Sequence, residues 1–506
     1  MVTERDPAPS ASGPASSAAP ESVDVLVVGG GNAGFCAAHA AAARGRRVLL
    51  IEKGRAEESG GNSFYTAGAF RIAHGGLADL GDLVEDDPRH TATELAAYPA
   101  EDFHADMKRV TGGRNDPGLT AALVEDGAAA LRWLRGLGLR FRLMYERQAY
   151  TGADGRHVFF GGLAVGSVGG GKGLIEQHEA AARAGGVEVR YGTGATGLIT
   201  EGGRVAGVRW SGADGGAGEI RAESVVLAAG GFEADAAMRR EHLGEGWERA
   251  SVRGTPLNTG EMLRAALRAG AAAGGDWSTC HSVAWDVAGP PGGGDRERTN
   301  TLTRQSYPLG IVVNAEGRRF VDEGADFRNY TYAKYGAEIL RQPGGRAFQV
   351  FDADLRPLLR AEEYDPEGTS VVTAGTLEGL ARAMGVPEEA FASTVRAFNA
   401  AVDRSVPFRP SVKDGRAARV DPPKSNWAHP IERAPFYAFP VTCGITFTFG
   451  GLRADDRGRA LDGRGEPVPG LFVCGEMLGG LFSGNYPGGS GLTSGAVFGR
   501  RAGALA

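Results

Sequence analysis

Three glycines and one acid near the start of the chain have the spacing of a nucleotide-binding loop. Gly29, Gly31 and Gly34 follow an apolar run, and Glu52 ends a second apolar run. Gly29 permits a tight turn, Gly31 lets a pyrophosphate approach bare backbone, and Gly34 lets a helix pack closely on a strand. A carboxylate at the position of Glu52 can accept hydrogen bonds from ribose hydroxyls. The spacing therefore predicts a dinucleotide site.

The elements that position these residues are expected to be a strand, a helix and a second strand. Residues 25–28 predict a short buried strand, the alanine-rich run that ends at Arg44 predicts a helix, and residues 48–51 predict another strand. The N-terminus of that helix would offer unpaired N–H groups to phosphates. Because 81 of the 506 residues are glycine, the triplet alone is weak evidence. The order of the elements makes the prediction specific.

The composition and charge exclude several classes of protein. A chain of 506 residues can bury a large core and divide into two or three domains. The net charge is −6 and no basic block is present, so neither nucleic acid nor anionic lipid is expected as a partner. No apolar run approaches the roughly 20 residues that a membrane span needs.

The cysteines and the N-terminal segment indicate a cytoplasmic protein. Cys36, Cys280, Cys443 and Cys474 form no C-x-x-C pair, which disfavours disulfide scaffolds, iron–sulfur ligation and covalent haem. Four reduced thiols and no metal site are expected. Residues 1–22 are rich in Pro, Ser and Ala and have no apolar centre, so they predict a disordered tail and not a signal peptide.

Further pieces of a nucleotide-binding fold recur along the chain as strands that end in small residues and helices that begin with glycine. Together they predict an α/β fold with a Rossmann-like parallel sheet. The expected pieces are a helix at 174–183, a strand at 187–190, a hairpin turning at Gly202–Gly203, a buried strand within 223–233, a strand within 470–480 and a helix within 488–503.

Residues 280–445 have a different pattern, which predicts an inserted α+β capping domain that covers the substrate. Its expected pieces are a strand, a turn at Glu316–Gly317 and a second strand within 308–323, then two helices within 376–403 with a break at 385–387. The predicted division is a tail at 1–22, a nucleotide-binding domain at 23–279 and 446–506, and the capping domain at 280–445.

Several separated motifs, in order along the chain, resemble the FAD-dependent fumarate reductase/succinate dehydrogenase flavoprotein superfamily. They are the first glycine block, AAGGFE (228–233), GLFVCGE (470–476) and PGGSGLTSGAVFGR (487–500). Within that superfamily, residues 103–120, 276–286 and 318–336 are most similar to tricarballylate dehydrogenases. The resemblance implies FAD as the resident cofactor and redox chemistry at a carbon–carbon bond next to an activating group.

The resemblance also implies which residues hold FAD. Residues 60–70 contain no counterpart of the histidine that attaches flavin covalently in succinate dehydrogenases, so noncovalent FAD is expected. The implied FAD-binding residues are Gly29, Gly31, Asn32, Ala33, Gly34, Glu52, Lys53, Gly61, Asn62, Ser63, Gly68, Ala195, Ala229, Gly230, Gly475, Glu476, Gly491, Leu492 and Thr493.

Three residues are the implied catalytic candidates. Arg328 matches, with a shift of one residue, the active-site arginine that follows the segment 319–323; the alternative is a surface arginine paired with Asp326 or Glu323. His281 stands where fumarate reductases place a substrate-binding histidine, and its alternative is a structural histidine. Tyr486 stands where those enzymes carry a substrate-binding arginine, and packing is its alternative.

Two departures from the fumarate reductase pattern leave the substrate open. Phe447 and Tyr486 replace two carboxylate-binding groups, which argues against fumarate or succinate itself. The expected substrate is tricarballylate or a similar carboxylate. A cyclic ketone is the alternative, because the segment around Tyr486 resembles ketosteroid dehydrogenases, and the arginines of the capping segment argue against it. Electrons are expected to leave to a partner protein, a quinone or oxygen; an electron-transfer flavoprotein is a further alternative.

Overall fold

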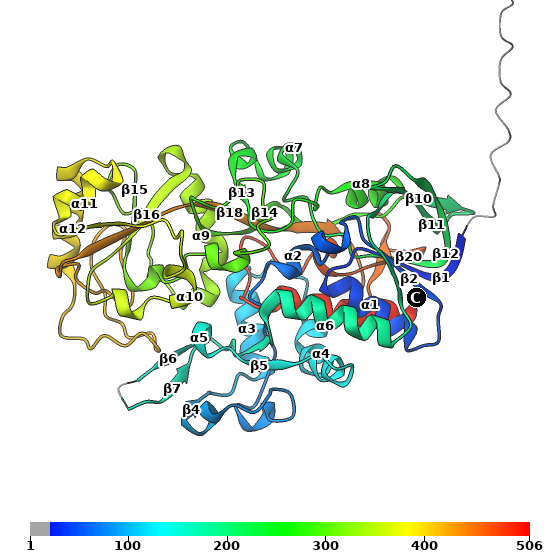
Figure 1. Cartoon of the computed structure of the whole chain (residues 1–506), viewed down its shortest axis with the longest axis horizontal. Helices are drawn as coiled ribbons and strands as arrows, with labels where there is room; N and C mark the ends of the chain where they lie inside the picture. The colour runs from blue at the N-terminus through cyan, green and yellow to red at the C-terminus, as the bar shows by residue number, and fades with distance from the viewer. Residues whose placement is uncertain (1–20, 153) are drawn as a thin grey trace, which may run out of the picture.

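The computed structural model describes residues 21–152 and 154–506. The molecule is elongated, with one sheet at each end of its long axis (Figure 1). The predicted tail lies outside the described residues except for Glu21 and Ser22, which belong to the first strand. There the prediction is wrong, because Glu21 pairs with the neighbouring strand and its carboxylate accepts two hydrogen bonds of 2.7 Å from Arg190.

The larger sheet confirms the predicted α/β fold. Its parallel strands, in spatial order, are β20 (Pro467–Val473), β12 (Ala217–Leu227), β1 (Glu21–Val28), β2 (Val48–Ile51) and β9 (Glu188–Arg190). These strands are rich in Val, Leu and Ile and mostly buried, as expected for a sheet covered on both faces. Their carboxyl ends meet at one edge, where ligands bind in such sheets.

An antiparallel hairpin and a short edge strand extend this sheet. β10 (Thr193–Glu201) and β11 (Arg204–Gly212) form the predicted hairpin, with positive φ at Gly202 and Gly203, and β11 then pairs with β12. β19 (Arg459–Leu461) pairs with β20. The helix expected at 174–183 is present and longer, as α6 (Gly170–Ala184).

Two helices that are far apart in sequence pack side by side in the cofactor half of the molecule. α1 (Asn32–Ala42) follows the glycine loop, and α13 (Ser490–Leu505) is the C-terminal helix; they lie together in Figure 1. A side chain at Gly499 or Gly503 would overlap the backbone of α1. These glycines allow the close contact that brings both ends of the chain to one site.

The smaller sheet is built on two long antiparallel strands. β14 (Ala273–Asp286) and β18 (Phe436–Leu452) pair along most of their length and run from the cofactor half into the other half of the molecule. β16 (Arg346–Phe351) and β15 (Ile311–Asn314) continue the sheet, while β13 (Ser251–Val252) and β17 (Val372–Ala374) also pair with β18.

The far half has its own apolar core, formed by the sheet and by α11 (Leu377–Met384) and α12 (Glu388–Ala401). These two helices and the break between them were predicted. The second strand expected near residue 320 is shortened to a single antiparallel bridge between Val313 and Arg319. Beyond it, Glu323 pairs with Arg319 and accepts a 2.8 Å hydrogen bond from the N–H of Val312. The Glu323 carboxylate thus takes the place of a backbone acceptor where the strand stops.

The remaining helices cover the two large sheets or connect them, and the remaining short strands form two further sheets of three strands each. The helices are α2 (Gly61–Phe64), α3 (Ala100–Val110), α4 (Pro117–Gly136), α5 (Tyr145–Gln148), α7 (Ala236–Met238), α8 (Glu261–Arg268), α9 (Tyr332–Leu340) and α10 (Ala361–Tyr364). The short strands are β3 (Ala69–Phe70), β4 (Thr93–Glu94), β5 (Phe141–Leu143), β6 (Ala149–Thr151), β7 (His157–Phe159) and β8 (Val165–Ser167).

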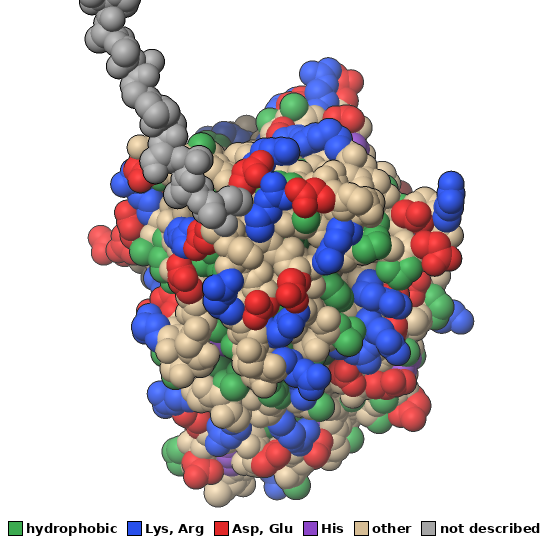
Figure 2. Space-filling model, turned by 90° about the vertical axis from the view of Figure 1, so that its right-hand side faces the viewer, with side chains coloured by type: hydrophobic (Ala, Val, Ile, Leu, Met, Phe, Trp, Pro, Cys, Tyr) green, Lys and Arg blue, Asp and Glu red, His purple; other side chains and the backbone are tan. Residues whose placement is uncertain are grey.

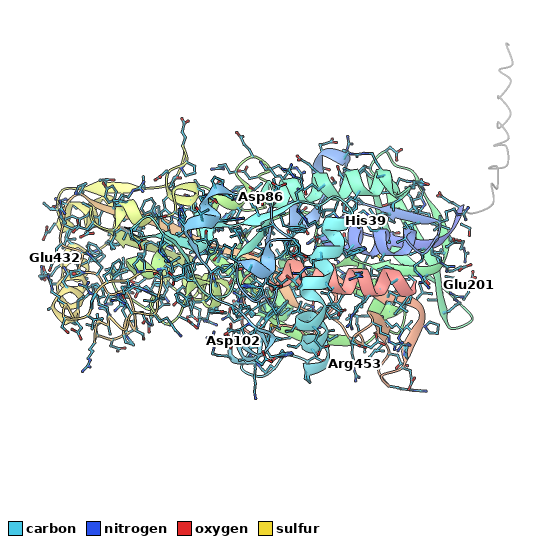
Figure 3. All side chains as sticks on the ribbon, turned by 90° about the horizontal axis from the view of Figure 1, so that it is seen from below. His39, Asp86, Asp102, Glu201, Glu432 and Arg453 are labelled. Atoms are coloured by element: carbon cyan, nitrogen blue, oxygen red, sulfur yellow. The ribbon has the colours of Figure 1, made fainter. Side chains whose placement is uncertain are left out.

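The surface carries charges of both signs. In Figure 2, which views the cofactor end of the molecule, basic and acidic side chains alternate over the visible face. Figure 3 places Glu201 and Glu432 at opposite ends of the long axis and His39 on the cofactor half. Within the described ranges no helix is long and apolar enough to cross a membrane. All four cysteines are buried and free.

Candidate active site and cofactor cavity

One large cavity begins at the carboxyl edge of the larger sheet and continues toward the junction with the smaller sheet. Gly29 follows β1, Glu52 follows β2, Ala228 follows β12 and Gly475 follows β20, and all four line it. The cavity therefore lies where parallel strands of an open α/β sheet bind their ligands.

Glu52 is positioned by backbone donors at the end of the cavity near β2. Its carboxylate accepts hydrogen bonds of 2.7 Å from the N–H groups of Gly30 and Gly54. Burial raises the pKa of Glu52, while these backbone donors lower it. A carboxylate held in this way can accept further hydrogen bonds from a ribose, as the sequence predicts.

Most of the sequence-predicted cofactor residues line this cavity. They come from the loop after β1, from α2, β10 and the N-terminus of α13, and from the segments after β2, β12 and β20. The predicted residues that line it are Gly29, Gly31, Asn32, Ala33, Glu52, Lys53, Gly61, Asn62, Ser63, Ala195, Ala229, Gly230, Gly475, Glu476, Gly491 and Leu492.

Gly34, Gly68 and Thr493 do not line the cavity, so the structure does not place them as direct cofactor contacts. A side chain at Gly34 would overlap the carbonyl oxygen of Gly29, so this glycine serves the close packing of helix on strand. Gly68 has a φ of +74° and faces Ser167 and Gly170. Thr493 is buried and donates a 2.8 Å hydrogen bond to the carbonyl oxygen of Arg71.

The walls of the cavity fit a dinucleotide with a pyrophosphate. An added Cβ at Gly31 or Gly61 would meet no atom closer than 3.5 Å, so both glycines expose bare backbone to open space. The N-terminus of α1 lies beside them, and its N–H groups carry partial positive charge that favours phosphate. These residues would hold the FAD pyrophosphate, while Glu52 would hold a ribose.

The other end of the cavity is an aromatic cluster around a buried histidine. The ring of His281 lies about 5 Å, between centroids, from the rings of Tyr332 (5.0 Å), Phe447 (5.1 Å) and Tyr486 (4.9 Å). Neither ring nitrogen of His281 has a hydrogen-bond partner within residues 21–152 and 154–506. Burial, with a smaller contribution from Arg253, holds the pKa of His281 well below its usual range, so the ring is neutral and free to bind a ligand.

Two phenols of the cluster are paired with each other. The hydroxyl groups of Tyr332, at the start of α9, and Tyr486, before α13, share a short hydrogen bond. Burial raises the pKa of both phenols, so each keeps its proton at neutral pH. In any such pair one hydroxyl donates to the other, which leaves the second O–H free to donate toward the cavity.

Two buried arginines face the same cluster. Arg253 donates to Thr446 (2.9 Å) and Asn300, and Arg328 donates to Gln305 (2.7 Å) and to the carbonyl oxygen of Arg147. The Nε of each has no partner, and neither guanidinium forms an ion pair with a carboxylate among the described residues. Both arginines line the cavity and are less than 9% exposed.

The surroundings of Arg328 lower the pKa of its guanidinium group. Burial is the largest cause, because it disfavours the charged guanidinium. The nearby cations Arg360 and Arg147 disfavour the charge further, so that the pKa of Arg328 falls to about 9. Arg147 is itself neutralised by Glu362 and by Glu363, which lies 2.7 Å away. A guanidinium is otherwise protonated at every accessible pH, so this environment is unusual.

The described part of the chain does not contain the pairings that were the alternatives for Arg328 and His281. Arg328 does not pair with Asp326 or Glu323, because Arg109 pairs with Asp326 and Arg319 pairs with Glu323. His281 lies in the cavity wall with two unpartnered nitrogens, so it is not a histidine satisfied by the protein fold.

The arginines of the capping segment bring less positive charge to the cavity than the sequence indicates. Arg298, Arg304 and Arg319 form ion pairs away from the cavity, with Asp295, Asp286 and Glu323 in that order. Arg318 is exposed, and only Arg328 among these five arginines lines the cavity. The positive charge of the site comes instead from Arg328 together with Arg253, which the sequence did not single out.

Sequence reasoning also missed Tyr332. It lies four residues after Arg328 in a segment that carries three tyrosines, and no local pattern separates the one that faces the cavity from the others. Arg253 lies in a loop with no recognisable motif. Only the pairing of β13 with β18, which fixes the backbone beside Arg253, brings that arginine to the cluster.

Comparison with known proteins decides the family. Residues 24–492 match the family described as FAD binding domain. The chain belongs to this family. It is therefore an FAD-dependent enzyme of the fumarate reductase/succinate dehydrogenase flavoprotein superfamily, in the class of dehydrogenases and reductases that act on CH–CH groups.

Three proteins of known name or structure are similar to this chain over most of its length. A probable fumarate reductase, Ifc3, from Shewanella frigidimarina is 30% identical over 96% of this chain and 74% of its own length. The 4-oxocyclohexanecarboxylate 2-dehydrogenase of Sinomonas cyclohexanicum is 28% identical over 94% of this chain and 90% of its own. The open conformation of a flavocytochrome c3 fumarate reductase superposes with a TM-score of 0.71 and 26% identity, over 96% of this chain and 78% of that one.

Proposed function

We propose that the protein dehydrogenates a carbon–carbon bond next to a carboxylate or carbonyl group in a small carboxylic acid. The observation that carries this proposal is the pair of buried arginines, Arg253 and Arg328, that face the cavity without a carboxylate partner. Buried cations are costly unless they are paired, and an anionic substrate would supply the missing charge.

The binding roles follow from the donors of the site. The forked guanidinium of Arg253 would bind a substrate carboxylate, because its Nε is unpartnered and its position is fixed by Asn300 and Thr446. The free O–H of the Tyr332–Tyr486 pair would donate to a carbonyl or carboxylate oxygen beside the reacting carbon. His281, which is neutral, would add one more hydrogen bond.

The proton and the hydride take separate routes in this proposal. Bound FAD supplies the acceptor of the hydride. Arg328 takes the proton from the neighbouring carbon, because its pKa of about 9 leaves a small neutral fraction at pH 7. Gln305 and the carbonyl oxygen of Arg147 hold the guanidinium in place while it exchanges that proton.

Tricarballylate, which the sequence resemblance implies, is one candidate substrate. It carries three carboxylates, which Arg253, the Tyr332–Tyr486 pair and His281 could hold while Arg328 exchanges the proton. A cyclic oxo acid is the second candidate, and the Tyr332–Tyr486 pair favours it, because a phenol polarises a ketone as well as it binds a carboxylate. The similarity to a 4-oxocyclohexanecarboxylate 2-dehydrogenase supports this second candidate.

Anaerobic bleaching of the flavin tests the proposal. The panel contains tricarballylate, succinate, 4-oxocyclohexanecarboxylate and an uncharged 3-ketosteroid. We expect bleaching by one of the acids and none by the ketosteroid. Arg253→Gln should abolish the bleaching, while Arg298→Gln, which removes an arginine already paired with Asp295 outside the cavity, should not. Bleaching by the ketosteroid alone would overturn the proposal.

The proposal also covers the binding of the cofactor, the domain boundaries and the electron acceptor. We propose that FAD is bound noncovalently by the cavity residues named above and that residues 280–445 form the capping domain. The expected boundaries fall inside β14 and β18, so the cap would share its strands with the cofactor domain. A separate protein, a quinone or oxygen would accept the electrons. Acid precipitation should release intact FAD into the supernatant.

A further inference from the structure

Two buried acids outside the proposed reaction meet beside the cavity. Glu233 lies six residues beyond the end of β12, and Glu476 lies in the turn Gly475–Met477 after β20. Both acids lie beside the same stretch of β18: Asn62, which donates to Glu233, also donates to the carbonyl oxygen of Thr446 (2.6 Å), and Glu476 accepts from Thr448 two residues further on. In this position each acid influences the protonation of the other. Glu233 is 0% exposed, while Glu476 lines the cavity. No step of the proposed reaction uses either acid.

The donors around Glu233 serve only one of its oxygens. Its Oε1 accepts hydrogen bonds of 2.6 Å from the side-chain amides of both Asn62 and Asn258, and its Oε2 has no partner in the part of the chain that the structure describes. The orientation of Asn62 is fixed, because its Oδ1 accepts a 2.9 Å hydrogen bond from the N–H of Thr255. Its amide therefore cannot turn to serve Oε2.

The donors around Glu476 likewise serve one of its two oxygens. Its Oε1 accepts hydrogen bonds from the N–H (2.8 Å) and the hydroxyl (3.2 Å) of Thr448. A side chain at position 231 would overlap both Glu476 and Thr448, so Gly231 is needed to admit the acid. The neighbouring cation, Arg239, donates to the carbonyl oxygens of Glu233 and Glu248 and to neither carboxyl group.

We propose that Glu233 and Glu476 share one proton at neutral pH and so place a single negative charge beside the FAD cavity. Two ionised carboxylates are acceptors only, and a buried pair of them would repel while Oε2 of Glu233 stayed unpaired. One proton between the two groups satisfies Oε2 and removes the repulsion. Burial raises the pKa of both acids, and the neighbouring Glu233 raises the pKa of Glu476 further, so that the proton is held most strongly by Glu476.

The shared proton has a consequence for the cofactor. A fixed negative charge near the flavin disfavours addition of electrons, so the pair lowers the reduction potential of bound FAD. The sharing sets the size of this charge at one unit and not two. The pair thus acts as a potential-tuning site whose residues need not touch the substrate.

Infrared difference spectroscopy of the FAD-loaded protein tests the shared proton. Wild type minus Glu233→Gln should show loss of one protonated-carboxyl C=O band, because the new amide donates to Glu476 and no proton is needed. Glu223→Gln, which removes an exposed carboxylate paired with Arg46, is the matched control and should show no such loss. If no protonated-carboxyl band is lost in Glu233→Gln, the sharing is wrong.

The midpoint potential of the bound flavin tests the charge. Glu233→Gln exchanges the shared proton for an amide and keeps one negative charge, so the potential should stay at its wild-type value. The double variant Glu233→Gln/Glu476→Gln removes the charge and should raise the potential. A raised potential in the single variant would mean that wild type carries two charges, and an unchanged potential in an FAD-loaded double variant would refute the tuning role. If the double variant loses FAD, the infrared band and the flavin potential of Glu233→Gln still test whether the two acids share a proton.

Discussion

Replacement of Tyr486 by phenylalanine tests the phenol pair at the centre of the site. The change removes one hydroxyl and leaves the ring, which packs between His281, Phe447 and Phe482, in place. The hydroxyl of Tyr332 then loses the partner that orients it, so the substrate oxygen that the pair would bind is left without an oriented donor. A buried polar group without a partner costs about 1–3 kcal/mol. We therefore expect kcat/KM to fall roughly 5- to 150-fold, since this free energy is lost from substrate and transition-state binding.

The assay is steady-state kinetics with the acid that bleaches the flavin, alongside flavin absorbance to measure occupancy. FAD content should stay at the wild-type level, because the hydroxyl faces Tyr332 and not the glycine loops. Tyr335→Phe is the control: that phenol is also buried, but it donates to the carbonyl oxygen of Asp322 and does not line the cavity. An unchanged kcat/KM for a fully loaded Tyr486→Phe would show that the residue serves packing alone.

Three further predictions concern the arginines and the cofactor. Arg328→Lys should keep FAD and lose about 10²- to 10³-fold in turnover, because lysine cannot donate to Gln305 and the carbonyl of Arg147 together. Normal turnover of this variant would show that Arg328 does not belong to the active site. The rate of substrate oxidation should rise with pH, reach half its maximum near pH 9 and level off above it, since only the neutral form of Arg328 accepts a proton. Arg360→Gln removes a repelling charge, raises the pKa of Arg328 and moves this rise to higher pH, whereas a flat profile would contradict proton transfer by Arg328. Gly31→Val should yield a folded, colourless protein, because the side chain fills the space for the pyrophosphate; a yellow variant with normal circular dichroism would show that FAD does not pass there.

The cofactor half could be predicted because its signals are local. The first strand, the glycine loop, α1 and β2 follow one another within about thirty residues, and each has its own periodicity or spacing. The sequence therefore located β2 to the residue and most of the cavity lining. Three predicted cofactor residues, Gly34, Gly68 and Thr493, lie outside the cavity lining, and their surroundings depend on what packs against them.

The substrate end could be predicted only in part, because its contacts join distant segments. Tyr332 and Tyr486 are 154 residues apart, and no motif near either residue indicates that the two hydroxyl groups pair. The buried ion pair of Arg319 and Glu323 overrides the strand pattern of its own segment, which propensity alone cannot reveal. Arg328 was found through resemblance to a family motif, and its neighbours Arg147 and Arg360 became visible only in three dimensions.

The continuous strands β14 and β18 also bear on how the molecule unfolds. Flexible linkers would let two domains melt one after the other, but here the same two strands run through both halves and hydrogen-bond to each other along the way. Loss of one half would leave long strands with unpaired backbone groups in the other, which is costly. Heat or denaturant should therefore disrupt both halves in a single cooperative transition, and a fragment cut at residues 280 and 445 should not keep its native sheet.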